Sequence, residues 1–112
     1  MSYMRLCVTT VDVKDGGNGK VRFDELTGAS EAPTAVCLVD VTGTNETEFV
    51  ATKVDFATFQ GLVREEAKKL RAKAIMLYAH GFRNSPGKVA ERTADCQVRM
   101  PGVLVLPVLW PA

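Results

Sequence analysis

Apolar and polar residues alternate with two different periods along this chain, and the period changes near residue 55. Before that point, short apolar runs rich in Val, Thr and Phe are separated by glycine-rich or polar turns, which is the pattern of β-strands. After it, apolar side chains recur every three or four residues, which is the pattern of an amphipathic helix. We therefore predict a single domain over residues 1–112, with a β-hairpin half at 1–54 and a helix-containing half at 55–112.

The first half is predicted to contain four strands arranged as two antiparallel hairpins. The first hairpin pairs 4–13 with 20–24 across a turn at 15–19, where three glycines adopt positive φ angles at little cost. The second hairpin pairs 34–41 with 46–54 across another glycine-containing turn.

The second half is predicted to begin with a helix at 55–71. Asp55 is placed to accept a hydrogen bond from the first backbone N–H groups of this helix. Phe56 and Phe59 begin an apolar stripe that continues at three- and four-residue spacing. We expect this stripe to pack on the sheet rather than to bind a ligand, because an amphipathic helix buries its apolar face.

The remainder is predicted to form a strand–helix–strand unit. Its strands are the apolar runs at 74–79 and 103–109, which are typical of strands buried on both faces. The helix between them, at 86–99, follows Ser85, a good N-cap residue, and has proline in its first turn. Two strands joined by one helix pair in parallel. The predicted fold class is therefore α/β, with a mixed sheet that has antiparallel N-terminal hairpins and a C-terminal parallel βαβ unit.

Composition and charge narrow the class of protein. Apolar residues make up 46% of the chain and charged residues 24%, as in globular domains, and no apolar run reaches the roughly 18–20 residues of a membrane span. No signal-peptide pattern opens the sequence, so we expect a cytoplasmic protein with no membrane partner. The net charge is only +1, and nucleic-acid binding normally needs a stronger basic balance, so no nucleic-acid partner is expected.

The charge is divided unevenly between the two halves. Residues 1–55 carry five Lys/Arg against nine Asp/Glu, and residues 56–112 carry nine against four. We interpret the basic face of the helix at 55–71 as solvated surface, with an acidic partner or head-to-tail self-association as the alternative.

The three cysteines do not form a metal-binding set. Cys7, Cys37 and Cys96 lie far apart in the sequence, and the chain has one histidine, so the spacing of a zinc site is absent. We interpret all three as reduced structural thiols. No metal and no cofactor are predicted.

The region around the histidine carries a family resemblance. His80-Gly81-Phe82-Arg83-Asn84-Ser85 follows one apolar strand, and Trp110-Pro111 ends the next. Together with the preceding helix, residues 55–112 resemble the amino-terminal half of an α/β-hydrolase, closest to a bacterial hydrolase-like group known only as a domain of unknown function. The resemblance implies a three-layer-like half of that fold.

In that family the loop after this strand supplies an N–H group to the oxyanion hole. The resemblance assigns that N–H to Phe82 and gives His80 a role in shaping the loop. The candidate ligand-binding residues are therefore His80, Gly81, Phe82, Arg83 and Asn84, and the expected ligand is a small acidic or ester-like molecule. No residue is assigned as catalytic.

The nucleophile elbow of that family, Gly-x-Ser-x-Gly, is absent from this sequence. The serines are Ser2, Ser30 and Ser85, and none lies between two glycines. A serine hydrolase needs a nucleophile beside a base, so hydrolysis is expected only if another chain completes the site. Three alternatives stay open: a non-catalytic half-domain that keeps the ligand crevice, a small interaction protein that acts through its sheet edge, and a truncated serine hydrolase or esterase.

A homodimer is the predicted assembly. In the α/β-hydrolase strand order, the strand at 74–79 lies between the strand at 103–109 and the elbow strand, which this sequence lacks. Its far edge is then left without a partner, and an open strand edge pairs readily with another chain. Twofold symmetry is the commonest way to close such a surface.

Overall fold

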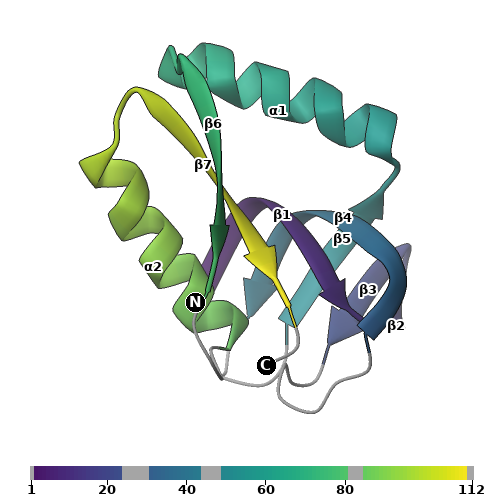
Figure 1. Ribbon diagram of the computed structural model, residues 1–112. Coiled ribbons are helices and arrows are strands. Elements are labelled where there is room, and N and C mark those ends of the chain that lie inside the picture. The colour runs from purple at the N-terminus through teal and green to yellow at the C-terminus, as the bar shows by residue number, and fades with distance from the viewer. Residues whose placement is uncertain (1, 24–30, 44–48, 81–84, 111–112) are drawn as a thin grey trace.

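The computed structural model of this chain describes residues 2–23, 31–43, 49–80 and 85–110. In chain order its elements are β1 (Ser2–Val11), β2 (Lys14–Gly17), β3 (Lys20–Phe23), β4 (Glu31–Gly43), β5 (Phe49–Val54), α1 (Phe56–Leu70), β6 (Ala74–Ala79), α2 (Pro86–Arg99) and β7 (Val103–Leu109). The described strands form one sheet in the order β2-β3-β5-β4-β1-β7-β6, with α1 and α2 on opposite sides of it (Figure 1). Neither helix is long and apolar enough to cross a lipid bilayer within the described residues.

The two helices and the last two strands follow the sequence prediction closely. α1 begins after Asp55, whose carboxylate accepts a hydrogen bond from the Thr58 N–H at 2.7 Å. α2 begins after Ser85, whose hydroxyl accepts one from the Lys88 N–H at 3.2 Å. β6 and β7 pair in parallel with an unbroken register. The predicted α/β fold class, a mixed sheet with a C-terminal parallel βαβ unit, is confirmed.

The pairing predicted between 4–13 and 20–24 is wrong. β1 lies inside the sheet, antiparallel to β4 and parallel to β7, while β3 pairs with β2 and β5. The reason lies in the turn, where Asn18 and Gly19 both have positive φ angles, 55° and 74°. Such a two-residue turn joins directly adjacent strands, so it closes the short β2–β3 hairpin and leaves β1 to other partners. The second predicted hairpin is confirmed as the antiparallel pair β4 and β5.

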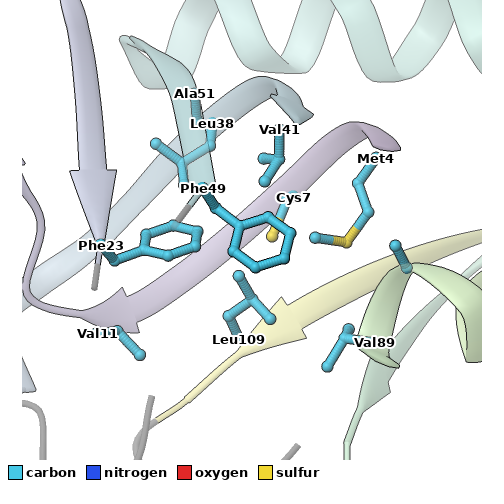
Figure 2. Packing of buried hydrophobic residues seen from close by; sticks show 11 residues of the cluster. Met4, Cys7, Val11, Phe23, Leu38, Val41, Phe49, Ala51, Val89 and Leu109 are labelled. Atoms are coloured by element: carbon cyan, nitrogen blue, oxygen red, sulfur yellow. The ribbon is translucent and has the colours of Figure 1, made fainter. Parts of the chain in front are cut away.

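Two apolar clusters fill the opposite faces of the sheet. Leu38 and Val39, neighbours in β4, belong to different clusters because successive side chains of a strand alternate between faces. On the α2 side, Phe23 and Phe49 stack with ring centroids 6.1 Å apart, within the cluster drawn in Figure 2. On the α1 side, Phe59 is buried against β1, β4 and β7. A helix therefore covers each face of the central strands.

Strand β6 is far more exposed than the sequence predicts. Ile75 and Leu77 are 53% and 65% exposed, whereas β7 is buried along most of its length. β6 is the last strand in the sheet order, and α1 packs chiefly on β7, β4 and β1. An apolar run predicts a strand but does not reveal whether a second strand or a helix covers it. The prediction that β6 is buried on both faces is therefore wrong.

Strands β1 and β7 pair only near their carboxyl ends, over two residues of each strand. Toward the amino end of β7, Gln97 of α2 takes the place of the missing neighbour. Its Nε2 donates to the Val103 carbonyl oxygen at 2.6 Å, and its Oε1 accepts from the Val105 N–H at 2.8 Å. A cavity of about 280 Å³ lies in this region. One amide side chain thus replaces the peptide group that a neighbouring strand would supply.

Candidate functional site

His80 follows β6 directly and is buried, with 3% of its surface exposed. Its imidazole stacks on the indole of Trp110, with ring centroids 5.0 Å apart and an interplanar angle of 16°. Trp110 Nε1 donates to the His80 carbonyl oxygen at 3.0 Å. The pair therefore ties the carboxyl end of β6 to the carboxyl end of β7.

The Nε2 atom of His80 is held by the backbone of the same partner. It lies 3.2 Å from the backbone nitrogen of Trp110 and 3.1 Å from the backbone carbonyl oxygen of Trp110. A neutral imidazole accepts from the N–H in one tautomer and donates to the carbonyl in the other. In both cases Nε2 is engaged within the fold. This geometry fixes the orientation of the His80 ring at the end of β6.

Sequence reasoning missed the partnership between His80 and Trp110, because the partnership depends on the register in which β6 pairs with β7. The parallel register places Ala79 opposite Val108. His80 therefore follows opposite Leu109, one residue before Trp110, and the two aromatic rings at these strand ends come close enough to stack.

Four of the five candidate ligand-binding residues, Gly81, Phe82, Arg83 and Asn84, lie outside the described residues. The oxyanion N–H assigned to Phe82 therefore stays a prediction. The next described segment begins at Ser85 and leads into the amino terminus of α2. Pro86 is buried there, and a Cβ atom added at Gly87 would lie 2.8 Å from the Ser2 Oγ and 3.3 Å from the Phe49 ring, so α2 packs tightly on the sheet at this end.

Burial lowers the reactivity of two of the three cysteine thiols in the described fold, Cys7 and Cys37. Cys7, Cys37 and Cys96 are all free. Complete burial raises the pKa of the Cys7 thiol to about 12, and partial burial also raises the pKa of Cys37. A thiol is nucleophilic only as its thiolate, so Cys7 is unreactive near neutral pH. The described residues also hold no cluster of three or more His, Cys, Asp or Glu side chains suited to a metal ion.

A polar cluster on the α1 side links β1, β4 and α1. The Tyr3 hydroxyl donates to Asp40 Oδ1 at 2.8 Å, Arg5 Nη1 donates to the same oxygen at 3.0 Å, and Arg5 Nε lies 3.9 Å from Glu66 Oε1. Burial, followed by the hydrogen bond to Asp40, raises the pKa of Tyr3. The Arg5 and Asp40 side chains are about half exposed. Pairs of this kind contribute about 0–1 kcal/mol, and we interpret the cluster as structural.

A groove of about 590 Å³ separates α1 from the exposed face of β6. Ile75 and Leu77 line its β6 side, and Phe56, which is 66% exposed, lines its α1 side together with Arg64. The prediction that Phe56 and Phe59 both pack on the sheet is therefore correct for Phe59 alone. Phe56 faces β6, where no further element covers the sheet in the described part of the chain.

A scan against protein-family models and searches of the curated proteins and the solved structures find no match to this chain. Its function is therefore inferred from the geometry of the site, because a fold class alone does not determine an activity. Two surfaces are candidates for function: the joined carboxyl ends of β6 and β7, and the exposed outer side of β6.

Proposed function

We propose that this chain is an α/β-hydrolase-like half-domain that binds a small acidic or ester-like ligand and does not hydrolyse esters alone. One observation supports the site most strongly. The parallel strands β6 and β7 end side by side, tied together by His80 and Trp110, at the end of the sheet where α2 begins. In α/β proteins, ligands bind in the crevice outside the carboxyl ends of parallel strands.

Backbone N–H groups are the donors available to a ligand at this end. Pro86 has no N–H, and the Lys88 N–H is used by Ser85. The Gly87 N–H has no partner among the described residues. The positive end of the helix dipole attracts a carboxylate, and N–H groups aimed at one point also stabilise an oxyanion. The N–H of Phe82 that the resemblance implies would complete this set of donors.

The absence of independent catalysis is supported by how the reactive side chains are used. An acyl-transfer site requires a nucleophile within hydrogen-bonding distance of a base. His80 Nε2 is engaged with Trp110, the Ser85 hydroxyl caps α2, and Cys7 is buried as a thiol. Within the described residues, these contacts occupy groups that a serine or cysteine nucleophile and a histidine base would need.

A hydrolysis assay tests the non-catalytic half of this proposal. The purified chain should cleave p-nitrophenyl acetate no faster than the His80→Ala variant. His80→Gln serves as a second control, because its amide can still hydrogen-bond to the Trp110 backbone and preserve the fold. Hydrolysis by the natural chain that both variants lose, while circular dichroism shows both folded, would contradict the proposal.

Ligand binding is tested separately by nuclear magnetic resonance. Sodium butyrate added to the ¹⁵N-labelled chain should shift the amide resonances of Gly87 and its neighbours, and leave those of β2 unchanged. A weak site, with a Kd of about 1–10 mM, is expected for so small a ligand. Sodium chloride at equal concentration is the control. Equal shifts with both salts, or no shift at Gly87, would contradict the proposed site.

The uncovered side of β6 favours a second candidate function, that of a protein-interaction domain. Ile75 and Leu77 expose more than half of their surfaces on β6, whose outer edge has no neighbouring strand among the described residues. Exposed apolar side chains beside free backbone groups are typical of a surface that pairs with another strand. The partner that fits this surface best is a second copy of the chain, because the same apolar strand edge would then meet itself.

A further inference from the structure

We propose that two copies of this chain join through β6, whose outer edges pair antiparallel about a twofold axis that passes through Met76. The inference deepens the second candidate function by naming its partner and register, and it does not depend on the ligand site. It starts from a difference between the two edges of the same sheet.

The edge formed by β2 is protected against pairing. β2 has four residues, all of them exposed. Two of these, Lys14 and Asp15, are charged, and the other two are glycines. The hydrogen-bond register with β3 is also irregular between Asp15 and Gly17. Short length, charge and irregularity are the features by which natural sheets prevent their edges from pairing.

The edge formed by β6 has none of these features. Its six residues, Ala74–Ala79, include no charged residue, no proline and no glycine, and its register with β7 is unbroken. Every second residue of a strand directs its N–H and C=O groups away from a given neighbour. The outward set on β6 has no strand partner among the described residues. In the described part of the chain, the β6 edge of the sheet is therefore open to pairing and the β2 edge is protected against it.

Symmetry restricts how β6 can pair with itself. A twofold axis perpendicular to the sheet keeps each side chain on its own face, so opposite residues must have the same parity. Centred on Met76, this pairing places Ile75 opposite Leu77 of the second copy, and Leu77 opposite Ile75 of that copy. Centred on Leu77, it would instead place Ile75 opposite Ala79. The first register gives both Ile75 and Leu77 of each copy a large exposed apolar partner, whereas the second gives one only to Leu77, which would lie opposite Leu77 of the second copy.

Charge does not oppose this pairing. The chain has a net charge of +1, so two copies repel each other weakly. In the register centred on Met76, the nearest charged residue, Lys73, lies opposite Ala79 of the second copy. Like charges therefore do not face each other across the paired strands, which would otherwise be destabilising.

Cysteine cross-linking tests the register, in a background in which Cys37→Ala and Cys96→Ala remove the two accessible thiols. Met76→Cys should form a disulfide-linked dimer under mild oxidation. Opposite Cα atoms in an antiparallel pair lie about 4.5–5.5 Å apart, within disulfide range. Leu77→Cys is the matched control and should remain monomeric under the same oxidation, because in this register its two Cα atoms lie about 8 Å apart, too far for a disulfide.

Light scattering tests the interface itself. The natural chain should have the mass of two chains at ~100 µM, where a micromolar Kd gives mostly dimer. Leu77→Lys should reduce the mass to that of one chain. Val98→Lys should remain dimeric, because Val98 is an equally apolar residue, 81% exposed, on α2 rather than on β6.

The cross-linking and light-scattering results test separately the register of the β6 pairing and the proposal that β6 is an interaction surface. If Leu77→Cys cross-links and Met76→Cys does not, the dimer forms through β6 in another register, and only the inferred register is overturned. A single-chain mass at all concentrations, or a dimer that Leu77→Lys leaves intact, would overturn both the second-copy partner and the β6 interaction function.

Discussion

Two polar side chains, His80 and Gln97, hold β7 in place from its opposite ends. His80 joins the carboxyl end to β6 through Trp110, and Gln97 bonds to the Val103 carbonyl and the Val105 N–H near the amino end. Both act where the regular ladder of the sheet stops. A backbone group left without a partner away from water costs about 1–3 kcal/mol, so Gln97 lets the amino end of β7 diverge from β1 without that penalty.

Replacement of Gln97 tests this role directly. Gln97→Leu should lower the free energy of unfolding by about 1–3 kcal/mol, because the Val103 carbonyl and the Val105 N–H lose their partner. The same substitution at Gln60, an exposed residue of α1, is the matched control and should change it by less than about 0.5 kcal/mol. Urea denaturation measures both values. Equal effects of the two substitutions would show that the Gln97 hydrogen bonds do not stabilise β7.

A second residue-scale prediction concerns pH. Hydrogen bonds from Thr58 lower the pKa of Asp55 below its ordinary value. The folded state therefore favours the carboxylate, and its contribution is present above the unfolded-state pKa and is lost as pH falls through the folded-state pKa. Asp55→Asn keeps an N-cap acceptor but does not titrate.

The urea midpoint of the natural chain should therefore fall relative to that of Asp55→Asn as the solution is acidified through this window. All other titrating groups are shared and cancel in the difference. A difference between the two midpoints that stays constant with pH would mean that the Asp55 carboxylate makes no charge-dependent contribution.

At the scale of elements, the sequence determines local structure better than long-range pairing. α2 is bounded as predicted, because Ser85 and Pro86 are start signals within the segment itself. The partners of β1 depend instead on residues about 30 and 100 positions away, such as Val39 and Val108, and no local pattern specifies them. The prediction that β6 is buried fails for a related reason. The run Ala74–Ala79 is apolar enough for the sheet interior, and its position at the edge is set by the order of the whole sheet.

Substitution of alanine for glycine is expected to change the stability of the fold in opposite directions at two positions, one in a helix and one in a turn. Gly61 lies inside α1, where an added Cβ would meet no atom within 4 Å, so Gly61→Ala should stabilise the fold by about 0.5–1 kcal/mol through higher helix propensity. Gly19 has a φ of +74° in the β2–β3 turn, so Gly19→Ala should destabilise it by about 1 kcal/mol. Thermal unfolding of both variants compares the two effects. A loss of stability in Gly61→Ala, or a gain in Gly19→Ala, would contradict these backbone assignments.

At the scale of the whole molecule, the candidate site is only partly predictable. The position of His80 at the end of a parallel strand can be inferred from the apolar run before it and from the strand–helix–strand pattern after it. Its fixed orientation cannot, because that depends on Trp110 being brought beside it by the pairing of β6 with β7. The groove beside Phe56 is also missed. The apolar stripe of α1 predicts that Phe56 packs on the sheet, and the groove lies where that contact is not made.

Among the described residues, the sheet has a protected edge at β2 and an open edge at β6, and the open edge adjoins the ligand site proposed at the ends of β6 and β7. In the proposed dimer, the paired β6 strands would form the centre of a continuous sheet, with α1 of both copies on one face.

Amide hydrogen exchange along β6 tests directly whether the outer edge of this strand is open in one chain and pairs with a second copy. In dilute solution, every second amide of Ala74–Ala79 should exchange rapidly, because alternate residues direct their N–H groups away from β7. At high concentration these amides should become protected, while the amides of β2 stay unchanged. Slow exchange of all β6 amides at every concentration would show that the edge is covered within a single chain. A rapid alternating pattern that persists at high concentration would show that no second copy pairs there.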